Sequence, residues 1–461
     1  MKMMTACFLA ALAGADAASA RSPDMSAESL RARVELSSRR LEAEKYRPDA
    51  VFLGEDKSNG WPGDTEGRTL LALVLQQEAL GVKPKYLDGI MRAVPSHLNA
   101  DGYFGKVRRG VASEQQMAGN GWLLRALCEY DRVEKDPVID AKGVVRRIAR
   151  GLFLANADLF PRYPVTAEAR KGMPVGGASG TTAAEVAGWE LSTDVGALFI
   201  GLDGLVQAWQ TTGDPDLKRP IEFIIARFEA FDPIDVKAQT HATLSGIRAL
   251  LRYDAKRFLP LAERRFDLYR LYGMTDRFEN YNWFLRYDTW TEPCAIVDSL
   301  LLAHRLGELT GKGAYAELEK NILAALVAHQ RPNGGFCLMK TFPKGTAHAP
   351  EIACEEAHWC CTMRGGAGLA TALRWTAGSR RAGHRLLRVR PRRLRADVPL
   401  SRRLAAFRYA SLCFCGILLH IVLTEICSGF YNSGHEPGAF ALAACVWTWY
   451  NFDTKNAKFA A

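Results

Sequence analysis

The sequence predicts an all-α protein, specifically an (α/α)6 toroid of about twelve helices. Three observations support this fold class. From about residue 26 to residue 377 the chain is a succession of amphipathic stretches, these stretches end at recurring glycine-containing stop signals, and convincing β alternation is missing. Because twelve helices in antiparallel pairs close such a ring, we expect one domain here despite the length of the segment.

The clearest helical pattern begins near residue 195. Apolar side chains recur there at i, i+4, i+7, i+8 and i+11, in Leu198, Leu202, Leu205, Val206 and Trp209. This spacing places all of them on one face of a helix, which is the face expected to be buried.

Stop signals of one form recur along the chain. Thr212-Gly213 and Thr310-Gly311 each end a helical pattern, since glycine accepts the left-handed conformation of a C-terminal cap. Each is followed within a few residues by a new amphipathic stretch. Counted in this way, the predicted helices span residues 27–45, 66–81, 84–98, 119–135, 143–156, 195–212, 216–231, 241–257, 259–273, 294–309, 315–330 and 365–376.

The longer loops share a polar–glycine–aromatic composition. It occurs in Asn99–Gly105, in Gly119–Trp122 and in Pro332–Phe336. At one end of a helical ring such loops would form a cup with stacking surfaces and hydrogen-bond donors, which suits a sugar. The alternative is that Asn-Gly and Asp-Gly are simply good turns.

Two short motifs predict a metal site. Glu292-Pro-Cys294 supplies a carboxylate and a thiol, and the adjacent pair Cys360-Cys361 follows on a well-separated segment of the chain. One carboxylate and three thiols are ligands that zinc accepts in tetrahedral geometry. Four protein ligands fill the ion, so the site would be a structural clip unless one thiolate is itself reactive. Cys354 and His358 flank the pair, and either could replace one of these ligands.

These motifs resemble the catalytic core of a known family. The run from Trp290 to Leu300 and the segment His358-Trp-Cys360-Cys361 are similar to glycoside hydrolase family 127, the β-L-arabinofuranosidases. The resemblance covers roughly residues 50–375 and is specific only at the motifs. It implies a retaining glycosidase in which Cys360 is the nucleophile, with zinc held by Cys360 itself and by the residues Glu292, Cys294 and Cys361. The family's β-sandwich has no counterpart in alternating strands here.

The resemblance places the acid/base glutamate at a fixed spacing before Glu292. That position is Asp276 in this chain, and the nearest glutamate is Glu279, which fits if the loop between it and Glu292 is shorter than in the family. We favour Glu279 because neighbouring aromatic residues would raise the pKa of its carboxyl toward the working range of an acid. Asp276 remains the alternative, and both could instead be exposed loop carboxylates.

One histidine and three tryptophans are candidates for contact with substrate. His241 lies in Gln-Thr-His-Ala-Thr, which resembles the family's H-A-N-T segment without its asparagine, and a helix cap or core role is the alternative. Trp283 and Trp290, with Trp359, could stack on a furanose ring or pack in the core. A second family histidine has no match, because the corresponding stretch carries Asp194.

The N-terminus predicts export. Met1–Ala20 combines an early lysine, a short apolar stretch and a small-residue cleavage site, as in a signal peptide. The mature toroid would then occupy residues 21–377 of a periplasmic or secreted protein. The odd count of eleven cysteines fits some of them being metal-bound or free.

The segment 378–461 differs from the rest. Eleven arginines, no lysine and one acid between Arg380 and Arg408 carry the whole net charge of +10. This run lacks interleaved aromatics, so we predict no nucleic-acid partner, and arginine-only basicity is typical of GC-rich codons read out of frame. The apolar run 409–423 is shorter than the roughly 20 residues of a membrane span, so no stable span is predicted. We expect this tail to be poorly ordered.

Taken together, the residues and the resemblance favour an exported retaining glycoside hydrolase with Zn2+ as cofactor and an oligosaccharide or polysaccharide as substrate. The alternative is a non-catalytic carbohydrate-binding relative with a structural zinc. A lyase on the same toroid is a third hypothesis with less support.

Overall fold

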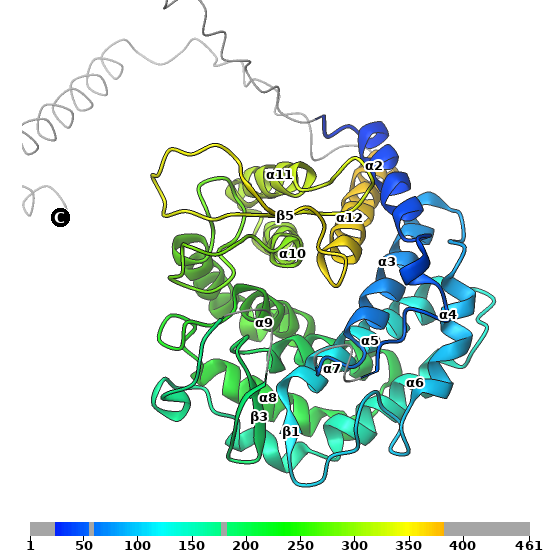
Figure 1. Cartoon of the computed structure of the whole chain (residues 1–461), viewed down its shortest axis with the longest axis vertical. Coiled ribbons are helices and arrows are strands. Elements are labelled where there is room, and N and C mark those ends of the chain that lie inside the picture. Colours follow the sequence, from blue (N-terminus) through cyan, green and yellow to red (C-terminus); the bar gives the residue numbers. More distant parts are fainter. Residues whose placement is uncertain (1–23, 55–59, 177–181, 382–461) are drawn as a thin grey trace, which may run out of the picture. The chain divides into compact units, whose positions relative to one another are not determined.

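The computed structural model describes residues 24–54, 60–176 and 182–381 (Figure 1). The predicted signal peptide and all of the tail beyond residue 381 lie outside the described residues. Among the described residues, no helix is both long enough and apolar enough to cross a membrane.

Six helices form a closed inner ring (Figure 1). Each packs against the next, and the last packs against the first. In order around the ring they are α3 (Asp64–Leu80), α5 (Glu114–Val133), α7 (Leu198–Thr212), the first part of α9 (Thr240–Tyr272), α10 (Pro293–Thr310) and α12 (Cys361–Arg381).

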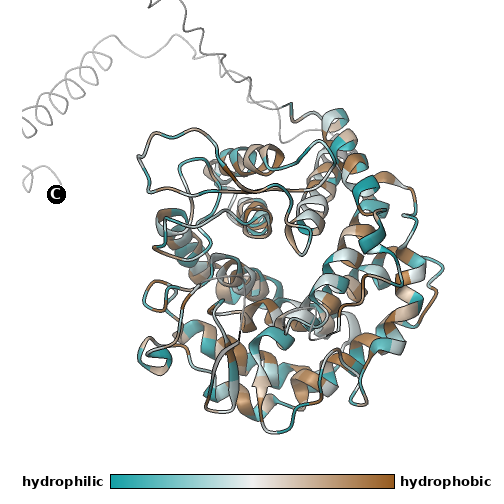
Figure 2. Ribbon diagram, in the orientation of Figure 1, coloured by the Kyte–Doolittle hydropathy of each residue, from teal (hydrophilic) through white to brown (hydrophobic). Residues whose placement is uncertain are grey.

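The remaining helices surround this ring. They are α2 (Ala27–Arg40), α4 (Leu87–Ala93), α6 (Ala141–Ile148), α8 (Lys218–Ala230), the second part of α9, and α11 (Gly313–Ala328). Single turns of 3-10 or π helix join them at Glu44–Tyr46, Val94–His97, Ala149–Leu154, Ala157–Arg162, Glu168–Arg170 and Pro215–Leu217. Figure 2 shows hydrophilic and hydrophobic turns side by side along the outer helices, as expected where one face is solvated.

The prediction of an (α/α)6 toroid is confirmed. All twelve predicted segments coincide with helices, although two of them are joined in α9. The backbone of α9 leaves helical geometry at Asp254, whose carboxylate accepts a hydrogen bond from the Arg257 backbone N–H at 3.0 Å. This residue therefore acts as the N-cap of the outer part, and the break comes a few residues earlier than the predicted one at residue 258.

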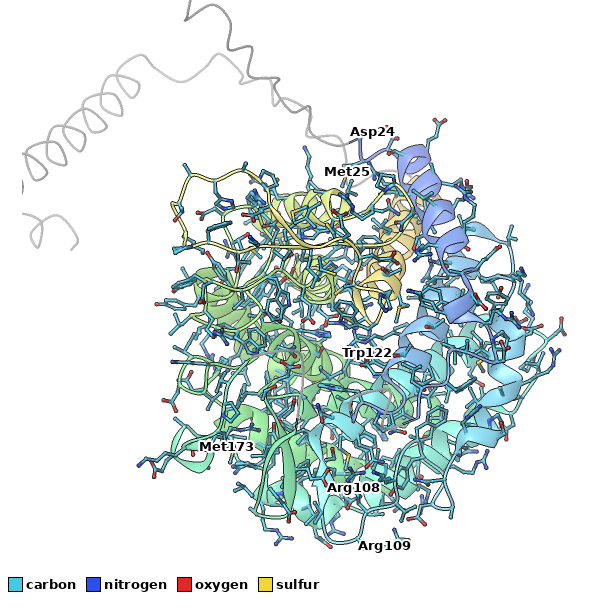
Figure 3. All side chains as sticks on the ribbon, viewed as in Figure 1. Asp24, Met25, Arg108, Arg109, Trp122 and Met173 are labelled. Carbon is cyan, nitrogen blue, oxygen red and sulfur yellow. The ribbon has the colours of Figure 1, made fainter. Side chains whose placement is uncertain are left out.

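Glycines allow the inner helices to touch backbone to backbone. A Cβ on Gly204 of α7 would lie 2.2 Å from the Gly121 carbonyl oxygen of α5, and a Cβ on Gly121 would lie 2.6 Å from the Gly201 Cα. Trp122, next to this crossing, is fully buried and lies near the centre of the ring (Figure 3). The crossing thus fixes the spacing of two helices that contribute to the site.

The ring closes through contacts between distant parts of the chain. α12 packs against both α2 and α3. Arg40 at the end of α2 forms a bidentate ion pair with Glu356, 316 residues later, with both N–O distances at 2.8 Å. Closure therefore depends on the last described helix.

Short strands lie in the loops at the ring's end. One sheet has the order β1 (Ala112–Ser113), β3 (Trp189–Ser192) and β2 (Thr182–Val186), and the other pairs β4 (Leu338–Met339) with β5 (Ile352–Cys354). Strands of two to five residues are too short to produce a recognisable alternation in sequence, which explains why none was predicted.

Candidate metal centre and active site

The N-terminal ends of the inner helices meet at one end of the ring. Arg68 in the first turns of α3 donates from Nη1 to the Cys294 sulfur of α10 at 3.2 Å. His241 Nδ1, at the start of α9, lies 3.9 Å from a carboxylate oxygen of Glu292. The Cys294 sulfur is 3.6 Å from that of Cys361, the first residue of α12. Four helix starts therefore converge on one point.

Three sulfur atoms form a compact buried cluster there. Cys360 and Cys361 have their sulfurs 3.3 Å apart, and with Cys294 all three lie within 4.8 Å of one another. Pro293 at the first position of α10 fixes the turn that presents Cys294, since proline is already set for a helix start. The structure thus brings together the two sequence motifs that were predicted to meet.

The three thiols share their protons unequally. Burial would raise the pKa of Cys294, but hydrogen bonds from Cys360 and Cys361 and the charge of Arg68 outweigh it and lower that pKa well below its ordinary value. The hydrogen bond with Cys294 raises the pKa of Cys360, and burial raises that of Cys361. Arg68 and the two neighbouring thiols therefore favour the thiolate form of Cys294 over its thiol form.

Glu292 adds a carboxylate beside the sulfurs. It is not part of the compact group of three sulfurs, but it lines the same pocket as Cys360 and Cys361. With the Asn282 amide nitrogen facing it, Glu292 accepts a hydrogen bond at 3.1 Å, and the amide oxygen accepts from Trp290 at 3.2 Å. Burial, and then the charge of Cys294, raises the pKa of Glu292 well above its ordinary range.

This donor set fits zinc. Thiolate sulfur and carboxylate oxygen are both normal zinc ligands, and three sulfurs with one nearby carboxylate supply the four that the ion takes. The three sulfurs are buried, and once deprotonated they would carry negative charge that the neighbouring Arg68 offsets only in part, so a bound cation would balance it. The cluster can therefore hold a metal ion.

A pocket of about 270 Å³ opens beside the cluster. This is close to the lower end of the roughly 300–1,000 Å³ typical of ligand sites, so it suits a small ligand such as one sugar unit. Trp359, 42% exposed, stands at its edge. Its lining residues are Asp194, Gln239, Asn282, Trp290, Glu292, Leu338, Ala353, Trp359, Cys360 and Cys361.

Of the residues predicted to contact substrate, some line the pocket and others are buried away from it. Trp290 lines the pocket, whereas Trp283 is fully buried and packs edge-on against Trp290 with ring centroids 5.4 Å apart. His241 is buried behind the pocket, with Nε2 3.2 Å from Asp298. It does not line the pocket, so its place is between the site and the core.

Neither predicted acid/base carboxylate lines the pocket. Glu279 is buried against its own loop, where it lies 3.5 Å from Arg277 Nε and 3.9 Å from His329 Nε2. Asp276 is exposed and accepts a hydrogen bond from the Gly345 backbone N–H at 2.6 Å. Phe278 has a positive φ of 61°, so the chain turns sharply between these two positions.

The alternative metal ligands stay apart from the sulfur cluster. Cys354 is half-buried in β5, and neither it nor His358 belongs to the compact group. His358 is exposed, and its backbone carbonyl accepts a hydrogen bond from the Tyr46 hydroxyl at 3.2 Å.

Two pocket residues were not predicted to have a function. Asp194 precedes α7, and Gln239 precedes α9; they are 6% and 4% exposed. Asp194 Oδ1 and Gln239 Oε1 have no hydrogen-bond partner among the described residues. These two buried acceptor atoms lie in one pocket, where the hydroxyl groups of a ligand or of water could donate to them. One feature of the sequence could have drawn attention to Asp194. It stands at the position where family 127, which the motifs resemble, carries a histidine.

A buried ionic network centred on Asp298 connects the helices that carry the site. Asp298 of α10 is fully buried and accepts hydrogen bonds from Ser245 at 2.9 Å and Arg248 at 2.7 Å, and it pairs with Arg364 of α12. These cations depress the pKa of Asp298 well below its ordinary value although burial alone would raise it. The network fixes α9, α10 and α12 relative to one another.

No family model matches this chain, and no curated protein matches it in sequence. Its fold is similar to a crystal structure of an unsaturated glucuronyl hydrolase specific for heparin, at 11% identity and a TM-score of 0.50, over 76% of this chain and 98% of that one. A glycoside hydrolase family 88 protein from Bacteroides vulgatus aligns at 10% identity over 76% and 99% of the two chains, with a TM-score of 0.47. A family 127 β-arabinofuranosidase aligns at 12% identity over 74% of this chain and 55% of that one, with a TM-score of 0.44.

At these identities the first similarity shows the fold alone. It agrees with the helical ring described above and is independent of the motifs. The chemistry of the site therefore has to be inferred from its own residues.

Proposed function

We propose that this chain is an exported retaining glycoside hydrolase whose nucleophile is the thiolate of Cys360. The observation that carries the proposal is that Cys360 belongs at once to the sulfur cluster and to the pocket wall. A purely structural zinc site would have no need to present a ligand to a cavity. Bound zinc would keep this sulfur deprotonated at neutral pH, where a free thiol is mostly protonated.

The pocket favours a neutral sugar. Asp194 and Glu292 lie in its wall, and no lysine or arginine is among the described residues that line it. A sugar carrying a carboxylate would find no arginine or lysine side chain in this wall to pair with it, and it would lie beside two carboxyl groups. A neutral pentose could instead donate hydroxyl protons to Asp194 and Gln239 and stack on Trp290 or Trp359.

The finer assignment rests on the sequence motifs. Glu292-Pro-Cys294 with Cys360-Cys361 resembles the β-L-arabinofuranosidase signature, so we propose β-L-arabinofuranosyl or related pentose linkages as substrate. Export rests on the predicted signal peptide and remains part of the proposal. The carbohydrate would be an oligosaccharide or polysaccharide outside the cytoplasm.

The proposed test combines turnover with the fate of Cys360. A panel of aryl pentofuranosides and pyranosides is offered to the full chain, and protein mass is measured after quenching. We expect turnover of a β-L-arabinofuranoside or a close analogue, with the sugar retained on Cys360 at short times. Cys360→Ser should lose activity by at least about 10³-fold because it removes the nucleophile, while the helical circular dichroism signal stays unchanged.

Cys354→Ser is the matched control, since Cys354 lies in β5, outside the cluster. It should keep the activity of the original chain. If the chain binds zinc and sugars but turns over none of the panel, the proposal fails and the site is that of a carbohydrate-binding relative with a structural zinc.

A further inference from the structure

Asp194 contributes to the pocket a carboxylate whose Oδ1 has no hydrogen-bond partner among the described residues. It lies between β3 and α7, where its backbone N–H donates to Ser192 Oγ at 3.1 Å and its carbonyl accepts from the Ala197 N–H at 3.1 Å. These contacts fix the backbone and do not involve the carboxylate. The side chain lines the pocket that Cys360 also lines.

The carboxylate is buried without a counter-charge. Asp194 is 6% exposed, its Oδ1 has no hydrogen-bond partner, and no ion pair involves it among the described residues. Burial, followed by the charge of Glu114, raises the pKa of Asp194 to about 7. A group in this state can both give and accept a proton near neutral pH, as an acid/base residue must.

The other acidic groups near the pocket are already engaged. Glu292 stands beside the sulfur cluster and accepts from the Asn282 amide. Glu279 lies near Arg277 and His329 and accepts from Thr275 Oγ1 at 3.4 Å, outside the pocket. Asp276 is exposed and holds the Gly345 backbone. Of these carboxylates, Asp194 and Glu292 line the pocket, and Asp194 is the one that is not needed beside the sulfur cluster.

We propose that Asp194 is the acid/base residue that works with Cys360, an assignment that rests on the glycosidase function proposed above. In the first step the Cys360 sulfur bonds to the anomeric carbon, the bond from that carbon to the leaving oxygen breaks, and Asp194 gives its proton to that oxygen. In the second step a water oxygen bonds to the carbon, the sulfur regains its electron pair, and Asp194 takes the water proton. One water is consumed, and no oxidant or reductant is needed.

The test uses Asp194→Asn, which keeps the size of the side chain but cannot transfer the proton. With alkyl glycosides, kcat/KM should fall about 10²–10⁴-fold, because a poor leaving group needs the proton. With a dinitrophenyl glycoside the first step should persist and the second should slow, so the sugar adduct on Cys360 accumulates in the mass spectrum. Azide should restore turnover and yield a glycosyl azide of retained configuration.

Asp288→Asn is the matched control, because Asp288 is an exposed carboxylate in the loop before Trp290. It should behave like the original chain. If Asp194→Asn does not fold, Asp194→Ala with added azide gives the same test, judged by the same adduct.

The outcomes separate the two proposals. If the original chain turns over no glycoside and forms no adduct, the proposed function fails and the assignment of Asp194 fails with it. If the original chain is active and Asp194→Asn matches it on alkyl glycosides, only the assignment of Asp194 is overturned. The same is true if Glu279→Gln shows the leaving-group and azide pattern instead.

Discussion

The two ends of the inner ring use the same helices but bury different groups. At the C-terminal end, α3, α7 and α10 stop at Gly81, Gly213 and Gly311, which have φ values of 74°, 66° and 68° and no neighbour within 4 Å of a Cβ position. At the N-terminal end the same helices begin among buried acids and thiols. Asp194 and Glu292, in particular, have raised pKa values there.

The comparison indicates that the groups at the N-terminal end of the ring lower the stability of the fold. The three glycine caps follow the ordinary rules for ending a helix. Buried acids with unpartnered oxygens oppose folding, and such departures from local rules are expected at functional sites. Perturbing the N-terminal end should therefore change metal content, pH dependence and stability together, whereas perturbing the C-terminal end should change stability only slightly.

The largest expected effect is on bound metal. We expect about one zinc ion per purified chain. Cys294→Ser removes one of the three clustered sulfurs and should lower metal affinity by at least about 100-fold, measured by elemental analysis of the purified variant. Cys354→Ser should retain the ion. A chain that is metal-free as purified, with full helical content and an unchanged melting temperature, would contradict the prediction.

A second large effect is expected in the ionic network below the cluster. Asp298→Ala leaves the buried cations Arg248 and Arg364 without their shared partner. The free energy of unfolding should fall by about 3–5 kcal/mol, measured by urea denaturation. Ser245→Ala removes a single hydrogen bond to the same carboxylate and should cost only about 1 kcal/mol. If both variants lost the same free energy of unfolding, the ion pairs of Asp298 would not be its main stabilising interactions.

An intermediate effect concerns pH. Burial raises the pKa of Glu66, at the start of α3, to about 8. The folded chain then keeps a proton that the unfolded chain releases above its lower pKa of about 4.3. Stability should therefore fall as pH rises between the unfolded pKa and the folded one, by up to about 1.4 kcal/mol per pH unit.

Glu66→Gln should remove this slope, because an amide does not titrate. The variant should match the original chain near pH 4 and be more stable at pH 8, by an amount on the order of 5 kcal/mol. Melting temperatures across this pH range test it. Parallel curves for the two proteins would refute a raised pKa at this position.

The smallest effect is expected at the opposite end. Gly213→Ala forces a residue with a side chain into a left-handed conformation in open space. The cost should be about 1 kcal/mol, with zinc content and the pH dependence unchanged. A loss of zinc in this variant would show that the two ends are coupled after all.

The helices could be predicted because their patterns are local. The four aliphatic residues of the stripe, Leu198, Leu202, Leu205 and Val206, are buried as their spacing predicts, and Trp209 at its end is partly buried. The position of the break in α9 was less accurate because it depends on one cap at Asp254, within an otherwise continuous pattern. The short strands in the loops form by pairing between distant segments, so the spacing of residues within one segment does not predict them.

Part of the site was predictable because its residues lie at helix starts, which local patterns locate. Cys294 and the Cys360-Cys361 pair lie at helix starts, so closing the ring brings them together. Glu279 was favoured over Asp276 for its aromatic neighbours, but the turn at Phe278 decides which way a loop side chain faces. Asp194 lies in an irregular segment after a strand. Its burial depends on tertiary packing, which no sequence motif predicts.

The closure of the ring by α12 also has a consequence for the order of folding. Contacts between α3 and α12 join the first and the last helix of the inner ring, and contacts of such long range form slowly because the intervening chain must first be ordered. On the ribosome the final pair of thiols emerges after every other inner helix has been made. Metal uptake should therefore be a late event, and during refolding it should lag behind the recovery of helical signal.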